Sequence, residues 1–260
     1  MNKIWIGTNW KMTKSTEEGL TYIENLIPIS EQLSSRIELF VIPSFTSLIP
    51  LQDSLAQTRI HLGAQNMHWE NEGAYTGEIS PKMLQEIGID IVELGHSERR
   101  QYYNENDQDI NKKVHAALNS GFSPLVCIGE NIEQKNFAIS RETLAMQLKT
   151  CLKGISKDQA EKVLVAYEPV WAIGEKGVPA DPAYVSYIHH FIREVLEEMF
   201  EESSFNIPLL FGGSVNQSNF LDYIHSPHVN GLFIGRAAWT TQSFENILTV
   251  LNEQITHNYL

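Results

Sequence analysis

Eight short, nearly all-apolar segments alternate with amphipathic helical segments along this chain of 260 residues. Apolar runs of strand length indicate strands buried on both faces, as in parallel sheets that are covered by helices. The expected strands are Lys3–Thr8, Ile37–Ile42, Ile60–Ala64, Ile89–Leu94, Ser123–Ile128, Val163–Tyr167, Pro208–Phe211 and Gly231–Ile234. Eight such units predict an α/β fold, a single (β/α)8 barrel that forms one domain over residues 1–260.

Helix-start and helix-stop signals lie between these segments. Ser15 followed by Glu18 predicts a capping box, and Ser80 followed by Pro81 predicts an N-cap with proline at the first helical position. Gly88 is expected to end that second helix. The alternative architecture is an open doubly wound sheet, but no G-x-G-x-x-G pattern follows the first strand.

The charge of the chain weighs against nucleic acid and anionic membranes as partners. Lys and Arg number 19 and Asp and Glu 32, which gives 19 − 32 = −13, and no basic run is present. Cys127 and Cys151 form neither a metal-binding spacing nor a disulfide framework. The first residues turn polar quickly, so we expect no signal peptide, no membrane span and a cytoplasmic protein.

Polar residues and glycines follow several of the expected strands. In a barrel the carboxyl ends of all strands open on one face, where active sites lie. The residues placed there are Asn9 and Lys11 after the first strand, His96 after the fourth, Glu168 after the sixth, Gly212-Gly213-Ser214 after the seventh and Gly235 after the eighth. Each has an ordinary structural explanation by itself, but together they are expected to surround one cavity.

Glu168 is a single acid at the end of the apolar run Val163–Tyr167. Pro169 follows, so Glu168 is held extended and cannot begin a helix. The next segment contains Gly174 and Gly177 and is too interrupted for a regular element. This pattern indicates a general base beneath a mobile lid, although strands also end in charged residues for no catalytic reason.

The other polar residues complete one chemical task. His96 can polarise an oxygen atom, and Lys11 can offset a negative charge. The glycine turns after the last two strands expose backbone N–H groups, the usual phosphate grip of barrels. We therefore predict proton transfer on a small phosphorylated substrate, with no cofactor and no metal. His189 and His190 point to different faces of their helix, and no further ligand completes a set with His225 and His228.

Several longer motifs carry a resemblance that covers the chain from Asn9 to about Gly235. They are Asn9-Trp10-Lys11, Gly77-Glu78-Ile79-Ser80, Gly95-His96-Ser97-Glu98-Arg99-Arg100, Cys127-Ile128-Gly129-Glu130, Tyr167-Glu168-Pro169-Val170-Trp171-Ala172-Ile173-Gly174 and Gly212-Gly213-Ser214-Val215. In this order and spacing they resemble the triosephosphate isomerase family, which implies the TIM-barrel fold.

The resemblance implies roles for individual residues. Glu168 is the base that moves a proton between neighbouring carbons, His96 the neutral electrophile, and Lys11 the cation that stabilises the enediolate and the phosphate. Asn9 binds the substrate oxygen, and Glu98 lies beside the site. Residues implied to give backbone donors to the phosphate are Gly174, Ser214 and Gly235. The lid would comprise Pro169, Trp171, Gly174, Gly177 and Pro179. The family is dimeric, and Thr76 lies on a loop like the one that enters the partner's site.

The sequence departs from the family at the lid and at the phosphate end. The lid reads Gly174-Glu175-Lys176-Gly177-Val178-Pro179, and Phe211 stands where the family usually has a tyrosine that bonds the closed lid. Pro179 has no N–H to receive that bond, so we expect a different latch. Arg236 replaces a glycine. It either pairs with the substrate phosphate or points to solvent and pairs with an acid.

These departures leave three functions open. The main expectation is triosephosphate isomerase, an aldose–ketose isomerase that interconverts dihydroxyacetone phosphate and D-glyceraldehyde 3-phosphate in glycolysis and gluconeogenesis. The alternative is a tetrulose-phosphate isomerase that acts on L-erythrulose 1-phosphate in polyol catabolism by the same mechanism. A remote alternative is a non-catalytic barrel used for binding, which the presence of Glu168, His96 and Lys11 argues against.

Overall fold

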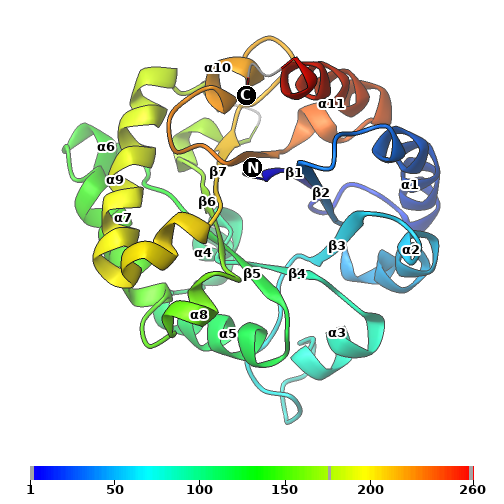
Figure 1. Cartoon of the computed structure of the whole chain (residues 1–260). Helices are drawn as coiled ribbons and strands as arrows, with labels where there is room; N and C mark the ends of the chain where they lie inside the picture. Colours follow the sequence, from blue (N-terminus) through cyan, green and yellow to red (C-terminus); the bar gives the residue numbers. More distant parts are fainter. Residues whose placement is uncertain (1–2, 175–176, 258–259) are drawn as a thin grey trace.

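The computed structural model describes residues 3–174, 177–257 and 260. Its parallel strands form one closed barrel in chain order, and β8 pairs with β1 to complete the ring (Figure 1). The strands are β1 (Ile4–Asn9), β2 (Ile37–Ile42), β3 (Ile60–Ala64), β4 (Ile91–Leu94), β5 (Ser123–Ile128), β6 (Leu164–Tyr167), β7 (Leu209–Gly213) and β8 (Gly231–Ile234). The predicted (β/α)8 barrel is confirmed.

The helices surround the barrel as an outer ring (Figure 1). They are α1 (Thr16–Glu31), α2 (Leu48–Leu55), α3 (Pro81–Ile87), α4 (Ser97–Tyr103), α5 (Asp107–Asn119), α6 (Ile132–Asn136), α7 (Ser140–Cys151), α8 (Lys157–Ala160), α9 (Pro182–Phe200), α10 (Phe220–Ile224) and α11 (Thr241–Thr256). Short 3₁₀ turns are η1 (Phe45–Ser47), η2 (Val170–Ala172), η3 (Glu201–Asn206) and η4 (Arg236–Ala238). The short helices α6 and α8 were not predicted, because their few residues show no amphipathic period.

The expected helix caps are present. Ser15 and Glu18 form a reciprocal capping box, with the Ser15 N–H donating to Glu18 Oε2 at 2.7 Å. Ser80 caps α3, Pro81 occupies its first turn, and Gly88 ends it with a left-handed backbone. The Ile89 N–H bonds to the Leu84 carbonyl. Strand β4 therefore begins two residues later than the apolar run suggests, because Ile89 still belongs to the turn after α3.

Apolar side chains form two separate layers. Nine residues fill the inside of the barrel: Phe40, Ile42, Ile91, Leu125, Cys127, Leu164, Ala166, Leu210 and Phe233. A larger cluster packs the outer face of the strands against the helices. Because the barrel interior is filled with apolar side chains, polar groups are accommodated near its ends, and an acid inside it is desolvated.

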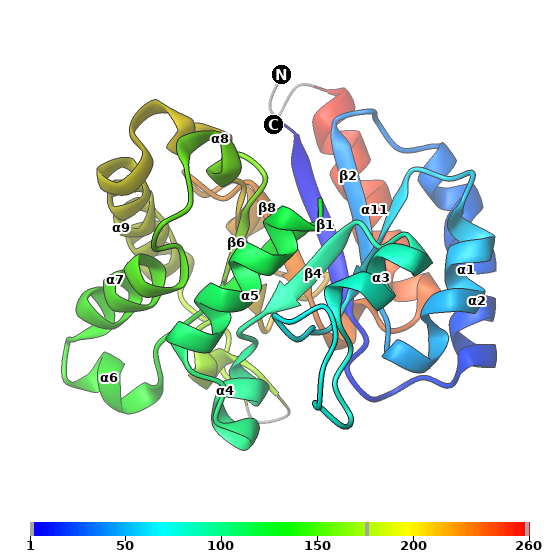
Figure 2. The ribbon, with the colours of Figure 1, turned by 90° about the horizontal axis from the view of Figure 1, so that it is seen from below.

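The carboxyl ends of the strands gather at the end of the barrel that carries α4 and the loop before α3. In Figure 2 this end lies at the bottom, and the start of β1 and the end of α11 lie at the opposite end. The loop after β3 is held to this end by a lysine that also belongs to a buried ion pair. Lys113 of α5 donates to Asn66 Oδ1 at 2.9 Å and also contacts the buried Glu105 carboxylate.

We expect Lys113→Met to lower the free energy of unfolding by about 3 kcal/mol, because Glu105 would lose its buried cationic partner. Arg99, 3.4 Å from Glu105, would compensate only in part. Urea unfolding measures the change. The double variant Lys113→Met with Glu105→Leu is the control, and it should recover part of the loss. A loss below about 1 kcal/mol for the single variant would contradict the role assigned to the pair.

Candidate active site

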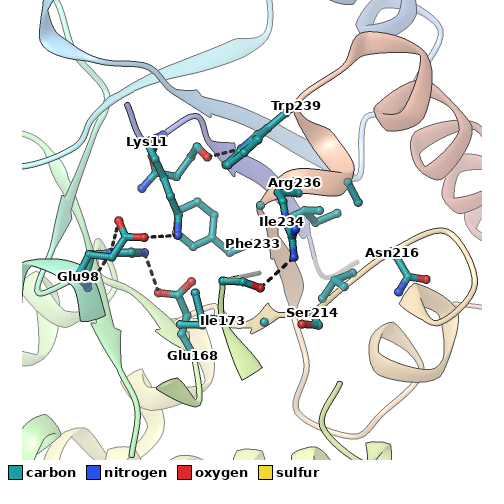
Figure 3. A pocket seen from close by; sticks show the side chains of 17 residues that line it. Lys11, Glu98, Glu168, Ile173, Ser214, Asn216, Phe233, Ile234, Arg236 and Trp239 are labelled. Atoms are coloured by element: carbon teal, nitrogen blue, oxygen red, sulfur yellow. Dashed lines mark hydrogen bonds and ion pairs between the residues drawn. The ribbon is translucent and has the colours of Figure 1, made fainter. Parts of the chain in front are cut away.

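A cavity of about 390 Å³ opens at the carboxyl ends of the strands (Figure 3). Its walls come from the loops after strands β1, β4, β6, β7 and β8. The lining residues are Asn9, Lys11, His96, Glu98, Glu168, Ile173, Gly174, Gly213, Ser214, Val215, Asn216, Phe233, Ile234, Gly235, Arg236, Ala237 and Trp239. The structure thus brings the expected base, electrophile, lysine and phosphate-end residues into one cavity.

The backbone of Lys11 is held in an uncommon conformation. Its φ is 53°, in the left-handed region that side chains other than glycine rarely adopt. Asn9 Oδ1 accepts the Lys11 N–H at 2.6 Å, and Gln65 Nε2 donates to the Lys11 carbonyl at 2.8 Å. Trp239 Nε1 donates to the Asn9 carbonyl at 2.9 Å. These bonds from several loops keep a strained residue directed into the cavity, where strain is expected at functional sites.

Lys11 and Glu98 form an ion pair, with Lys11 Nζ 2.7 Å from Glu98 Oε1. The pair is partly exposed, and Figure 3 shows it on one side of the cavity. Both side chains line the cavity, so a bound anion can approach the Lys11 ammonium group beside its carboxylate partner. Glu98 was expected beside the site, and the structure places it there.

His96 is the N-cap residue of α4. Its Nδ1 accepts the Glu98 N–H at 3.2 Å, so the proton of the neutral ring lies on Nε2. Burial lowers the pKa of His96 below its usual value of 6.5, and the nearby Glu168 carboxylate opposes this in part. His96 is therefore neutral at physiological pH, and its Nε2–H can donate to an oxygen in the cavity.

Glu168 lies directly after β6 and in contact with the cavity. Its Oε2 is 3.9 Å from His96 Nε2. Among the residues that the structure describes, no donor bonds to this buried Oε2. Two glycines make room for the acid, because a Cβ on Gly212 would lie 2.7 Å from Glu168 Cγ and one on Gly129 would lie 2.0 Å from its carbonyl oxygen. An unpartnered carboxylate oxygen beside a neutral imidazole can accept a proton from a bound substrate.

The start of the lid is anchored by Glu130. Glu130 Oε1 accepts from Tyr167 Oη at 3.1 Å, Trp171 Nε1 at 3.1 Å and Tyr184 Oη at 2.9 Å. Lys135 lies 3.5 Å from the centre of the Trp171 ring. At the far end, Tyr223 Oη donates to the Ala180 carbonyl at 2.7 Å. Side-chain hydrogen bonds thus hold both ends of the segment expected to form the lid.

The middle of the lid is held by residues of the loops after β7 and β8. Ser214 Oγ donates to the Ala172 carbonyl at 2.8 Å and contacts the Gly177 carbonyl at 3.3 Å. Arg236 Nη2 donates to the Gly174 carbonyl at 2.9 Å (Figure 3). Of the lid residues singled out from the sequence, Glu175 and Lys176 lie outside the described residues.

These contacts bear on two sequence expectations. Arg236 was expected either on the phosphate or in solvent with an acid; its side chain is exposed, and its described hydrogen bond goes to the Gly174 carbonyl of the lid. Phe211 is fully buried and packs on Tyr223 with ring centres 4.5 Å apart. Phe211 thus supports Tyr223, which carries the hydroxyl that bonds the lid.

Ser214, Asn216 and Arg236 lie on the side of the cavity away from Glu98 (Figure 3). Gly174 and Gly235 also line the cavity, as expected for a phosphate end. Asn216 was not predicted, because an asparagine two residues after Ser214 in a turn has no distinctive sequence signal.

Glu93 is the functional-site neighbour that sequence reasoning missed. It lies within β4, is fully buried, and accepts from Asn9 Nδ2 at 2.7 Å. Burial and then the Glu168 charge raise the pKa of Glu93 well above its usual value of 4.5. The available signal was an acid inside an otherwise apolar strand, two residues after the inward-facing Ile91.

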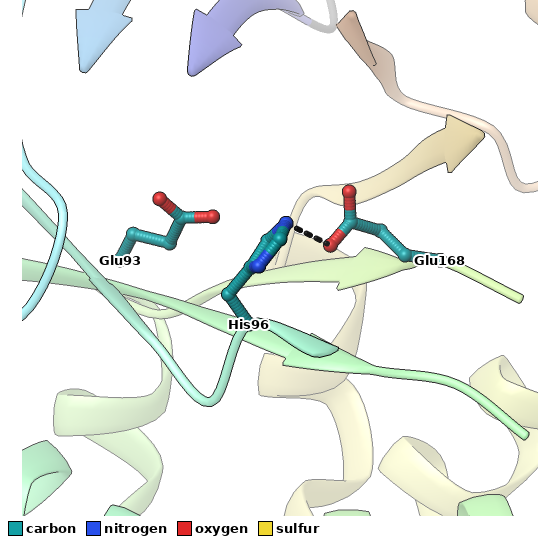
Figure 4. A group of neighbouring side chains, drawn as sticks. All are labelled: Glu93, His96 and Glu168. Carbon is teal, nitrogen blue, oxygen red and sulfur yellow. Dashed lines mark ion pairs between the residues drawn. The ribbon is translucent and has the colours of Figure 1, made fainter. Parts of the chain in front are cut away.

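Glu93, His96 and Glu168 offer one ligand atom each within 4.8 Å of one another (Figure 4). Among the described residues this is the set with the spacing to hold a metal ion. A metal there would need His96 to give up the Nε2 proton that its Nδ1 contact fixes, and it would occupy the free oxygen of Glu168. These three side chains are therefore better suited to proton transfer than to binding a metal ion.

Thr76, expected at a subunit contact, lies on the exposed loop 70–78 between β3 and α3. The described part of the chain has no helix with the length and apolar character needed to cross a membrane.

Comparison with known proteins gives consistent matches. The family model described as "Triosephosphate isomerase" matches residues 4–251. The L-erythrulose-1-phosphate isomerase of Rhizobium etli is 42% identical over 253 residues, which cover 97% of this chain and 94% of that protein. The protein of the same name from Brucella abortus biovar 1 is 43% identical over 249 residues, 95% of this chain and 96% of that protein.

We expect Gly212→Ala to reduce kcat/KM about 100-fold. The added Cβ would push the Glu168 side chain about 1 Å from its position, and a misplacement of that size slows the chemical step. The fold should survive, since the clash is with a side-chain end rather than with backbone. Steady-state kinetics and thermal unfolding check both parts. Unchanged kinetics would mean that Glu168 is not held against Gly212 in the working enzyme.

Proposed function

The chain belongs to the triosephosphate isomerase family, and we propose that it isomerises L-erythrulose 1-phosphate by proton transfer through an enediolate. The observation that carries the chemistry is the convergence of Glu168, neutral His96 and Lys11 on one cavity. The four-carbon substrate is supported by the names of the relatives, which match nearly full length at 42–43% identity. The comparisons thus favour the alternative over the three-carbon substrate that was our main expectation.

The proposed reaction moves one proton between neighbouring carbons. Glu168 removes the proton from C3, while His96 Nε2–H donates to the carbonyl oxygen on C2. Lys11 offsets the negative charge of the enediolate, and Asn9 binds a substrate oxygen. Return of the proton to C2 leaves the carbonyl on C3. The product is then a second ketose, erythrulose 4-phosphate, so the aldose–ketose description applies only to the three-carbon reaction.

The phosphate is proposed to lie at the end of the cavity formed by Gly174, Ser214 and Gly235, on the side away from Glu98. Arg236 is exposed and holds the lid carbonyl of Gly174 next to this end. In this proposal Arg236 replaces the missing tyrosine latch and couples lid position to the loop after β8. An altered latch is consistent with a substrate that carries one more hydroxymethyl group.

We also propose a homodimer in which the loop that carries Thr76 approaches the partner's Asn9 and Lys11. The exposure of this loop and of Met12, which is 95% exposed beside Lys11, supports the proposal. Sedimentation analysis tests it.

Glu168→Gln is expected to abolish turnover, because the amide cannot accept the proton. In D₂O the wild-type enzyme should place solvent deuterium on C3 of erythrulose 4-phosphate, the carbon that was the C2 carbonyl of L-erythrulose 1-phosphate, and proton NMR detects the loss of that C3–H signal. The variant should exchange at least about 10³-fold more slowly and unfold at a similar temperature. Substantial residual exchange would assign the base to another residue.

Arg236→Gly is expected to raise KM about 3- to 10-fold, because the variant loses one hydrogen bond of modest strength to the lid. Arg236→Lys is the matched control, since it keeps the positive charge but lacks the planar guanidinium group. A KM that is unchanged by the glycine variant would show that Arg236 is only a surface charge.

A further inference from the structure

Glu93 is a carboxyl group buried inside the barrel at the level of the active site. It stands two residues after Ile91 on β4, and Ile91 belongs to the inner apolar cluster. Because side chains alternate along a strand, Glu93 also faces inward. The proposed reaction gives it no task, and it does not line the cavity. A desolvated acid in an apolar interior is costly to keep unless it serves another group.

Asn9 connects Glu93 to the cavity. Asn9 Oδ1 accepts two N–H groups, from Lys11 at 2.6 Å and from Gln65 Nε2 at 3.2 Å. These two donors fix which end of the amide is oxygen, so Nδ2 must face Glu93, to which it donates at 2.7 Å. The amide nitrogen carries a second hydrogen, and Asn9 lines the cavity. By accepting the first hydrogen of Asn9 Nδ2, Glu93 therefore sets the direction of the second one.

Glu93 also lies beside the proposed base. One oxygen of Glu93, a ring nitrogen of His96 and one oxygen of Glu168 lie within 4.8 Å of one another (Figure 4). Cys127 Sγ contacts the other oxygen of Glu93 at 3.7 Å. Two carboxyl groups this close in a desolvated site do not both ionise readily, and the charge of Glu168 is one cause of the raised pKa of Glu93.

We propose that Glu93 is a positioning residue for the isomerisation: it orients the Asn9 amide toward the substrate oxygen, and as a neutral acid it leaves Glu168 the charged carboxylate of the pair. The inference rests on the proposed function. The charged or titratable groups that face Glu93 are Lys11 after β1, His96 and Glu98 at the start of α4, Cys127 on β5 and Glu168 after β6.

The protonation state of Glu93 is expected to affect the rate of isomerisation. Ionisation of Glu93 at high pH would add a second negative charge beside the developing enediolate and slow the reaction. The wild-type kcat/KM for L-erythrulose 1-phosphate should therefore fall on the alkaline side. Glu93→Gln, which keeps an acceptor for Asn9 but cannot ionise, should retain the neutral-pH rate within about 3-fold and lose that alkaline fall.

A double-mutant cycle tests the path through Asn9. Glu93→Leu removes the acceptor and should lower kcat/KM about 10- to 100-fold. In the Asn9→Ala background the same change should have little further effect, because the amide it orients is gone. Ile91→Val, on the same strand and face, controls for altered packing and should leave kcat/KM within about 2-fold.

A substrate-independent readout separates this inference from the proposed function. The unfolded chain ionises Glu93 near its usual pKa of 4.5, while the folded chain keeps the proton to higher pH. The folded state thus binds one more proton in this window, and the free energy of unfolding falls as the pH rises above about 4.5. Glu93→Gln should remove that part of the slope.

The outcomes divide clearly. If the wild-type enzyme turns over no sugar phosphate, the proposed function fails, and the pH slope of stability still decides whether Glu93 is neutral. An unchanged slope in Glu93→Gln overturns the neutral acid. An unchanged alkaline fall in an active Glu93→Gln, or an effect of Glu93→Leu that is fully additive with Asn9→Ala, overturns the positioning role.

Discussion

The burial of three titratable side chains at the carboxyl end of the barrel governs how the groups there are arranged. Glu93, His96 and Glu168 are all buried within a few ångströms of one another, where an unpaired charge is expensive. Burial lowers the pKa of His96 and raises the pKa of Glu93. Both shifts favour the uncharged form of the group concerned. A neutral imidazole donor beside one carboxylate is the pair that proton transfer between carbons requires.

The rest of the structure supplies this pair with rigid support. Hydrogen bonds from Gln65 and Trp239 hold the loop that carries Asn9 and Lys11, and Gly212 gives Glu168 the space it occupies. The lid is treated differently, since its two ends are fixed by Glu130 and Tyr223 while its middle is held by a few bonds to backbone carbonyls. Anchored ends with few contacts between them are the arrangement expected if this segment serves as the proposed lid.

Much of this site could be predicted from the sequence because one rule places it. Polar residues directly after buried parallel strands share one end of a barrel, and that rule brought Lys11, His96 and Glu168 together. Glu93 was missed because it lies inside an apolar run and serves the site from beneath. The lid contact of Arg236 joins residues 62 positions apart and depends on side-chain direction, which no local pattern encodes. The short helices α6 and α8 escaped prediction because they are too short to show an amphipathic period.

The most direct test of the account is kcat/KM measured side by side for L-erythrulose 1-phosphate and D-glyceraldehyde 3-phosphate. A site adapted to the additional hydroxyl group should prefer the four-carbon substrate by at least about 100-fold. Turnover of the three-carbon substrate near the diffusional limit of about 10⁸ M⁻¹s⁻¹, with a lower value for the four-carbon substrate, would contradict the account. The lid and Arg236 changes would then be neutral variation in a triosephosphate isomerase.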